Sequence, residues 1–123
     1  MLWYTHAAML GHDTGAGHPE RRARLEALLP AIRGLAIPGL VEREAPCATL
    51  EQIGRVHLEP YPGTLLAAAP ERGHTRLDPD TVMSPGSIEA ALRAAGAVCA
   101  AVDAVLAGPE SRAFCAVRPP GHH

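Results

Sequence analysis

Residues 113–117 read Ala-Phe-Cys-Ala-Val, and they run directly into Arg118-Pro119-Pro120-Gly121-His122-His123. A short, continuous apolar run without polar alternation is typical of a strand buried in a parallel sheet. In open α/β sheets, ligands bind just beyond the carboxyl ends of the strands. Imidazole titrates near neutral pH and suits proton transfer. The stretch therefore predicts an α/β domain in which His122 and His123 form part of an active site at a strand end.

The segments upstream predict the other elements of such a domain. Residues 1–5 and 40–45 are candidate strands, and residues 88–107 are the clearest helix, with apolar side chains from Ile88 to Leu106 at helical spacing and Gly96 permitting close packing. A helix is expected to begin at Pro19 and to kink or end at Pro30. Shorter helices are expected after Thr49, with Gln52 completing a capping box, and over residues 60–69. Residues 73–86 are expected to form a long functional loop.

Composition limits the class of protein. The chain is 47% hydrophobic and 20% charged, which are globular values, and residues 1–123 show no break that would mark a second domain. A net charge of -2 and a pI near 6.4 give no broad attraction to nucleic acid or to an anionic membrane. Arg93 and Asp103 argue against a membrane span in the longest apolar stretch.

The cysteines and basic residues indicate where such a chain would work. Its three cysteines lie far apart without a Cys-x-x-Cys pair, which favours free thiols in a reducing cytoplasm. All eleven basic residues are arginine, and lysine and asparagine are absent, which indicates GC-rich codons and a bacterial source.

Four segments in order resemble the zinc-dependent histone deacetylase superfamily, which includes acetylpolyamine amidohydrolases and acetoin-utilisation proteins. The hexapeptide at residues 118–123 resembles its Arg-Pro-Pro-Gly-His-His motif. His18-Pro19-Glu20-Arg21 resembles its early loop-and-helix signature, and Val56-His57 with Tyr61 resembles a further segment. Residues 77–81, with the helix that follows, resemble its acidic loop. The resemblance spans nearly the whole chain, from about His12 to His123.

The resemblance implies a three-layer αβα arginase/deacetylase-like fold with a mostly parallel sheet, incomplete in this chain. It implies a zinc-dependent hydrolase acting on acetylated lysine peptides, polyamines or other small amines. By resemblance, His123 would be the general base that later acts as an acid, and His122 would orient the water. Asp80, or Asp78 beside it, would contact substrate at the pocket rim, and Arg21 would lie near an internal channel. For Arg21 a solvent-exposed place in the first helical turn is an equal alternative, and Glu20 is simply expected at a helix N-terminus, where the dipole favours a carboxylate.

The implied zinc ligands, an Asp-x-His pair and a later aspartate, lie downstream of the double histidine in the family. No residue of this chain is therefore predicted to bind the zinc, and the 123 residues are expected to be an inactive N-terminal portion of a deacetylase. The alternative is a non-catalytic relic or binding module. A third hypothesis is a metal site formed by His6, His12 and His18 with Asp13.

Overall fold

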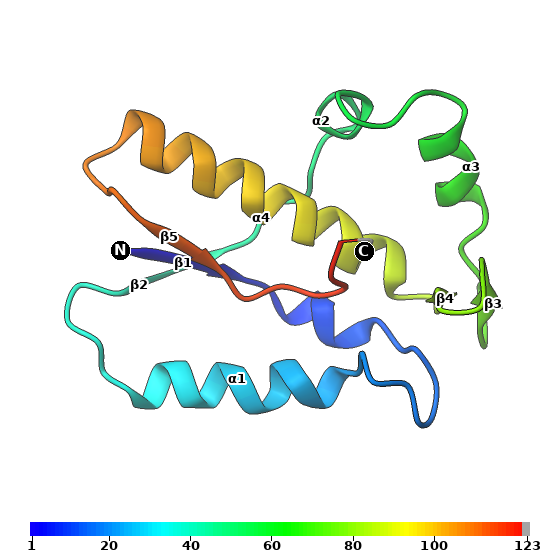
Figure 1. Ribbon diagram of the computed structural model, residues 1–123, viewed down its shortest axis with the longest axis horizontal. Coiled ribbons are helices and arrows are strands. Elements are labelled where there is room, and N and C mark those ends of the chain that lie inside the picture. Colours follow the sequence, from blue (N-terminus) through cyan, green and yellow to red (C-terminus); the bar gives the residue numbers. More distant parts are fainter. Residues whose placement is uncertain (122–123) are drawn as a thin grey trace.

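The computed structural model describes residues 1–121, and a parallel sheet lies at its centre (Figure 1). Strand β1 (Leu2–Thr5) lies between β2 (Val41–Glu44) and β5 (Ala113–Cys115), giving the order β2-β1-β5. Both pairings are parallel, with Trp3 opposite Glu42 on one side and Phe114 on the other. All four residues of β1 are buried, because strands flank it on both sides and residues of η1, α1 and α4 pack against its side chains. The predicted α/β fold with a parallel sheet is confirmed.

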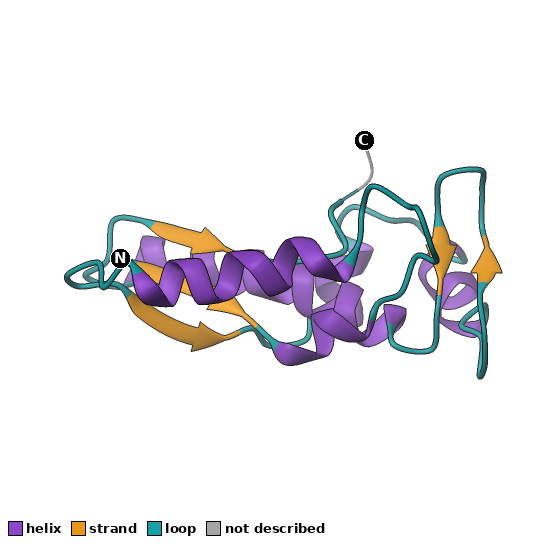
Figure 2. Ribbon diagram, turned by 90° about the horizontal axis from the view of Figure 1, so that it is seen from below, coloured by secondary structure: helices purple, strands orange, loops and turns teal. Residues whose placement is uncertain are grey.

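Two long helices complete three layers, and the strands run between α1 (Arg22–Gly34) and α4 (Ser87–Ala107) in Figure 1, with the sheet seen from another side in Figure 2. A short 3-10 helix, η1 (Ala7–Gly11), follows β1 and packs against both long helices. The core between the layers joins large side chains of β1, η1 and α1 to alanines of α4. Its members include Trp3, Tyr4, Met9, Leu25, Leu29, Ala97, Ala101 and Ala116.

Helix α1 departs from its prediction at the start and in the middle. It begins at Arg22 rather than at Pro19, because the Glu20 carbonyl accepts a hydrogen bond from the Thr14 hydroxyl at 2.5 Å and Arg21 is extended. The helix also continues through Pro30 to Gly34. Pro30 lies on the exposed side of α1, so water can hydrate the carbonyl that lacks its helical donor.

The buried face of α4 is made of small residues rather than of the large apolar ones. Ala90, Ala94, Ala97 and Ala101 are buried, whereas Val102 and Leu106 of the predicted stripe are 50% and 81% exposed. Small side chains let the helix axis approach the sheet closely. The prediction that the stripe of larger apolar residues forms the packed face of α4 is therefore wrong. The close contact predicted at Gly96 is confirmed, since a Cβ there would collide with the backbone of Pro46 and Ala48.

By length and composition α4 could also cross a membrane, with a mean hydropathy of 1.7 over its most apolar window. The same test is passed by core helices of soluble proteins, and α4 packs against β1, β5 and η1. It is therefore weak evidence for a membrane span.

Short elements lie beyond the sheet. Helix α2 (Leu50–Gly54) begins at the predicted Thr49–Gln52 capping box, and α3 (Tyr61–Ala67) lies within the predicted range. The expected loop at residues 73–86 instead contains an antiparallel pair, β3 (Thr75–Arg76) with β4 (Val82–Met83). Strand β5 is parallel as predicted, but it lies at the edge of the described sheet and Phe114 is 43% exposed. The prediction that this strand is buried on both faces is therefore wrong for the described residues.

Candidate functional site

A buried arginine stands where the predicted active-site turn begins. Arg118 follows β5 and is only 3% exposed. Its Nε and Nη2 each donate to a carboxylate oxygen of Glu20 at 2.9 Å. Its Nη1 donates to the carbonyls of Met9 and His12, both at 2.7 Å. Two parallel charge-assisted bonds and two carbonyl bonds use most of the guanidinium donors, so the side chain is held in one orientation.

Glu20 is the counter-charge of this arginine. Burial alone would raise the pKa of its carboxyl group, but the two hydrogen bonds and the positive charge of Arg118 outweigh burial, and the net pKa lies below its usual value. Glu20 is therefore an ionised, paired carboxylate near neutral pH. The two partners are 98 residues apart in the sequence, so the pair joins the loop before α1 to the end of β5.

His12 extends the cluster toward the start of α4. Its Nδ1 lies 2.7 Å from the Ser87 hydroxyl and its Nε2 lies 3.6 Å from a Glu20 oxygen. Burial, followed by the charge of Arg118, lowers the pKa of His12, so the ring is neutral. An unprotonated Nε2 would face a carboxylate, so the proton belongs on Nε2 and the Ser87 hydroxyl donates to Nδ1.

Two serines close the cluster on the side of α4. The Ser84 amide donates to the Ser87 hydroxyl at 2.7 Å, and the Ser84 hydroxyl accepts from the Asp13 amide at 2.8 Å. Ser87, His12 and Glu20 thus have the residue types of a nucleophilic triad. Ser87 is only 4% exposed, however, so substrate has no access to its hydroxyl. We call Arg118, Glu20, His12, Ser84 and Ser87 the Arg118 cluster, and its observed contacts are structural.

A second set of contacts ties the predicted rim loop to this cluster. His18 Nε2 donates to the Asp80 carbonyl at 3.2 Å, while His18 Nδ1 accepts from the Glu20 amide at 3.1 Å. His74 Nε2 lies 3.0 Å from an Asp13 carboxylate oxygen. The hydrogen bond from the Gly15 amide and the one from His74 hold the pKa of Asp13 below its usual value. The loop at residues 13–20 and the segment at residues 74–84 are therefore joined at several points.

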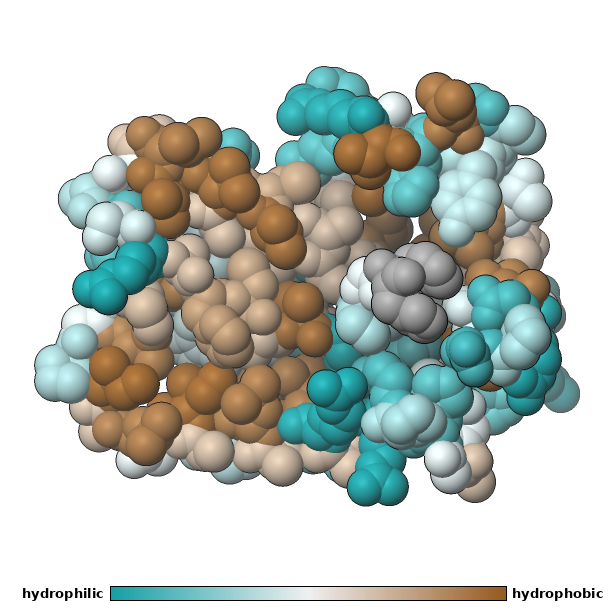
Figure 3. Space-filling model, viewed as in Figure 1, coloured by the Kyte–Doolittle hydropathy of each residue, from teal (hydrophilic) through white to brown (hydrophobic). Residues whose placement is uncertain are grey.

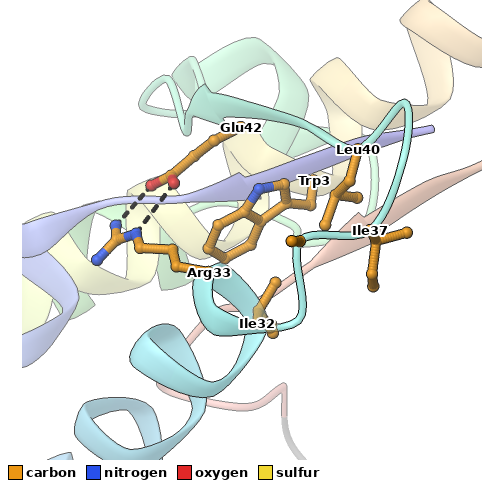
Figure 4. A pocket seen from close by; sticks show the side chains of 7 residues that line it. Trp3, Ile32, Arg33, Ile37, Leu40 and Glu42 are labelled. Carbon is orange, nitrogen blue, oxygen red and sulfur yellow. Dashed lines mark hydrogen bonds and ion pairs between the residues drawn. The ribbon is translucent and has the colours of Figure 1, made fainter.

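The described surface has hollows at two places that bear on the site. One, of about 340 Å³, is lined by Thr14, Gly15, Ala16, His74, Arg76 and Val82, beside the joined loops. The other, of about 190 Å³, lies between α1 and the sheet, where Figure 4 shows Arg33 reaching Glu42 beside the Trp3 ring. It offers apolar packing surface and one ion pair rather than catalytic groups. In Figure 3 polar residues gather at the end of the molecule that carries the joined loops, and apolar residues gather over the sheet and long helices.

The fold and the cluster can be compared with known proteins. The sequence model of the Histone deacetylase domain matches residues 18–123. The chain belongs to this family. The expectation drawn from the four segments is thereby confirmed.

Relatives of this histone deacetylase family chain come from several kingdoms. It is 40% identical over 121 residues to the histone deacetylase-like amidohydrolase of Pseudomonas aeruginosa, covering 98% of this chain and 30% of that protein. It is 36% identical to a probable deacetylase of Archaeoglobus fulgidus, covering 96% and 33%. The crystal structure of the HDA15 HD domain superposes with a TM-score of 0.90 at 26% identity, over 100% of this chain and 37% of that one. The chain spans about a third of the length of these relatives.

The structure of the deacetylase-family chain describes the surroundings of two of the four predicted site residues, Asp80 and Arg21. His122 and His123 lie outside the described residues. Asp80 is exposed, and its backbone carbonyl contacts His18. Arg21 is exposed as the N-cap of α1 and, within residues 1–121, makes no cap hydrogen bond with its side chain. Glu20, expected only to favour a helix dipole, is instead the buried partner of Arg118.

Residues 1–121 contain no group of three His, Cys, Asp or Glu side chains that could hold a metal ion. The described residues therefore do not fit the zinc that the family implies. The alternative site at His6, His12 and His18 is not formed: His6 Nδ1 accepts from the Ala8 amide, and His12 and His18 make the bonds described above.

Sequence reasoning missed Arg118, Glu20, His12 and the serines as a cluster. One signal could have found part of it. An arginine that directly follows an apolar strand must be paired if it is buried, and Glu20 lies in a matching family segment.

Proposed function

We propose that this chain forms the N-terminal part of a zinc-dependent deacetylase that hydrolyses acetylated lysine or acetylated amines in the cytoplasm. Membership of the Histone deacetylase domain family supports a deacetylase, and the observation that carries the proposal is the burial of Arg118. This arginine opens the Arg-Pro-Pro-Gly-His-His motif, so the segment that leads to the two histidines starts from a fixed point.

In this proposal the residues of the chain supply proton transfer and substrate contact. His123 acts as general base and then acid, and His122 assists it; such proton transfer contributes about 10²–10⁴-fold to a rate. The exposed Asp80 carboxylate attracts the positive charge of a peptide or polyamine substrate. The zinc ligands would come from residues outside this chain, so the chain alone is expected to be inactive.

A chimera tests the proposal. The whole chain replaces the matching 121 residues of the Pseudomonas aeruginosa amidohydrolase, and hydrolysis of an acetyl-lysine peptide and of an acetylpolyamine is measured. We expect activity in the chimera, none in the chain alone, and loss in the chimera that carries His123→Ala. A folded, zinc-loaded chimera without activity would reject the enzyme and favour the non-catalytic alternative.

A further inference from the structure

We propose that one side of α4 and the free edge of β5 form a docking surface, made of Val98, Val102, Leu106 and residues 113–115. Its occupant is the part of a histone deacetylase domain that lies outside this chain, which adds a strand beside β5 and covers the apolar side chains of α4. The inference rests on the proposed function, in which residues outside this chain complete the enzyme, but its test measures contact rather than activity.

The two edges of the sheet differ in charge. Within residues 1–121, β2 and β5 each have β1 as their one strand partner. Three of the four residues of β2, at positions 42–44, are charged and exposed. Charged side chains on an edge strand keep it from pairing with further strands. Residues 113–115 of β5 carry no charge, so this edge suits a further strand, whereas the edge at β2 suits water.

The backbone of β5 can offer hydrogen-bonding groups to such a strand. The Ala116 amide donates to the Tyr4 carbonyl of β1 at 2.9 Å. Alternate residues of a parallel strand bond the same neighbouring strand, and the residues between them turn their N–H and C=O groups to the other side. Ala113 and Cys115 therefore turn these groups to the free edge. A covered backbone group needs a partner, and a further strand supplies both donors and acceptors.

The exposed apolar side chains of α4 lie on the same side as this edge. Gly96 approaches the segment after β2, where a Cβ would collide with the Pro46 carbonyl oxygen. An α-helix turns by about 100° per residue, so Val98 lies about 200° around the helix from Gly96, away from β2 and toward β5. Val102 and Leu106 follow at intervals of four residues and share this side. Val98, Val102 and Leu106 are 49%, 50% and 81% exposed.

The apolar area continues across the sheet to its other face. Phe114 is opposite Trp3 in the parallel pairing, so the two side chains point to the same face of the sheet, and Trp3 lies beside Arg33 of α1. In Figure 3 apolar residues gather over α4, the sheet and α1. A continuous apolar area on a protein surface marks an interface.

The lengths of related proteins indicate the occupant. The HDA15 HD domain superposes on the whole of this chain with a TM-score of 0.90, and the match covers 37% of that longer chain. The matched part of the Pseudomonas aeruginosa amidohydrolase is 30% of that protein. A domain that contains this fold as about a third of its length has further residues to pack against it. The uncharged edge of β5 and the apolar side of α4 are where those residues fit.

An introduced cysteine tests the docking surface in the chain alone and in the chimera described above. Val102→Cys replaces an apolar side chain by one of similar size. Asp103→Cys is the matched control, because Asp103 is the next residue of α4, is exposed and carries a charge that favours water. The readouts are the rate of alkylation by iodoacetamide at the introduced cysteine, located by mass spectrometry, and the amide exchange of residues 113–115.

In the chain alone both introduced cysteines should react readily, because both positions are exposed. In the chimera we expect Val102→Cys to react at least about 10-fold more slowly than in the chain, and Asp103→Cys to keep its rate. The amides of Ala113 and Cys115 should exchange at least about 10-fold more slowly in the chimera.

Each outcome decides a different point. A chimera in which Val102→Cys is slowed no more than Asp103→Cys overturns the docking surface, whether the chimera is folded or not. Protection of Val102→Cys in the chain alone, with sedimentation as a dimer, assigns the surface to a second copy and overturns the stated occupant. An inactive chimera with a protected Val102→Cys rejects the proposed function and retains the docking surface. An active chimera in which both cysteines react readily does the reverse.

Discussion

Gly96→Ala probes how closely α4 approaches the segment after β2. A Cβ built at Gly96 collides with the carbonyl oxygen of Pro46 and lies 2.6 Å from the amide nitrogen of Ala48. Both atoms belong to the backbone, so a side-chain rotation cannot relieve the contact. The segment at residues 45–48 has to move away from the helix.

The movement breaks two hydrogen bonds. The Ala48 amide donates to the Leu92 carbonyl at 2.8 Å, and Arg93 Nη1 donates to the Ala45 carbonyl at 2.8 Å. Overpacking costs about 1–3 kcal/mol, and each lost hydrogen bond costs about 1 kcal/mol. The higher helix propensity of alanine stabilises the folded state by about 1 kcal/mol and offsets part of this loss. The net effect is a loss of about 2–4 kcal/mol in the free energy of unfolding.

Urea unfolding of the chain, followed by fluorescence, measures this loss. Trp3 is the one tryptophan and is 2% exposed at the centre of the sheet, so its emission reports the core. Gly34→Ala is the control, because nothing lies within 4 Å of its Cβ and its backbone is helical. It should be neutral or stabilising by up to about 1 kcal/mol. A Gly96→Ala variant as stable as the Gly34→Ala variant would refute the close approach.

Further predictions concern pH, a helix cap and the rim. Burial holds the pKa of folded His12 below its unfolded value of 6.5, and Arg118 holds that of Glu20 below 4.5, so both groups bind protons more readily when unfolded. The stability that these two groups contribute is therefore fully present above pH 6.5 and is lost as the pH falls. Urea unfolding at several pH values should show that the free energy of unfolding falls less steeply below pH 6.5 in His12→Gln than in the unchanged chain. An equal pH dependence in the two proteins would contradict the neutral, buried state of His12. Thr49→Ala removes the acceptor of the capping box on α2 and should cost about 1 kcal/mol in the same assay, whereas no change would mean that α2 unfolds separately. Asp80→Asn in the chimera should raise KM for an acetylpolyamine about fivefold, because it removes one exposed ion pair with the substrate, and should leave kcat unchanged. An unchanged KM would show that Asp80 does not contact the substrate.

The sequence predicts the elements of this fold where the signal is local. The capping box at Thr49 and Gln52 is a pattern of two residues in one turn, and both of its hydrogen bonds form. The apolar runs at residues 1–5 and 113–117 predict strands by their own composition, and both pair in parallel. Such signals depend on neighbours in the sequence, so they survive without knowledge of the tertiary structure.

The predictions that fail concern features that depend on residues far away in the sequence. The alanine face of α4 is packed because the sheet lies close to it, and hydrophobicity alone favours the larger Val102 and Leu106. Strands β3 and β4 have two residues each, too few to show a period along the sequence. The Glu20 side chain, which precedes α1, is held by Arg118, 98 residues away, and this partner cannot be seen from the local sequence.

In the candidate site too, the local motif could be predicted from the sequence and the distant contacts could not. The double histidine is visible in the sequence as a motif, but the partners of Arg118, the first residue of that motif, lie 98 to 109 residues away from it in the chain. Arg118 lies next to its acceptors because β5 pairs with β1, and η1, which carries the Met9 carbonyl, packs against α4. The burial and pairing of Arg118 therefore depend on the tertiary structure and cannot be predicted from the motif alone. A substitution of Glu20, in the loop before α1, therefore removes the counter-charge of an arginine 98 residues further along the chain.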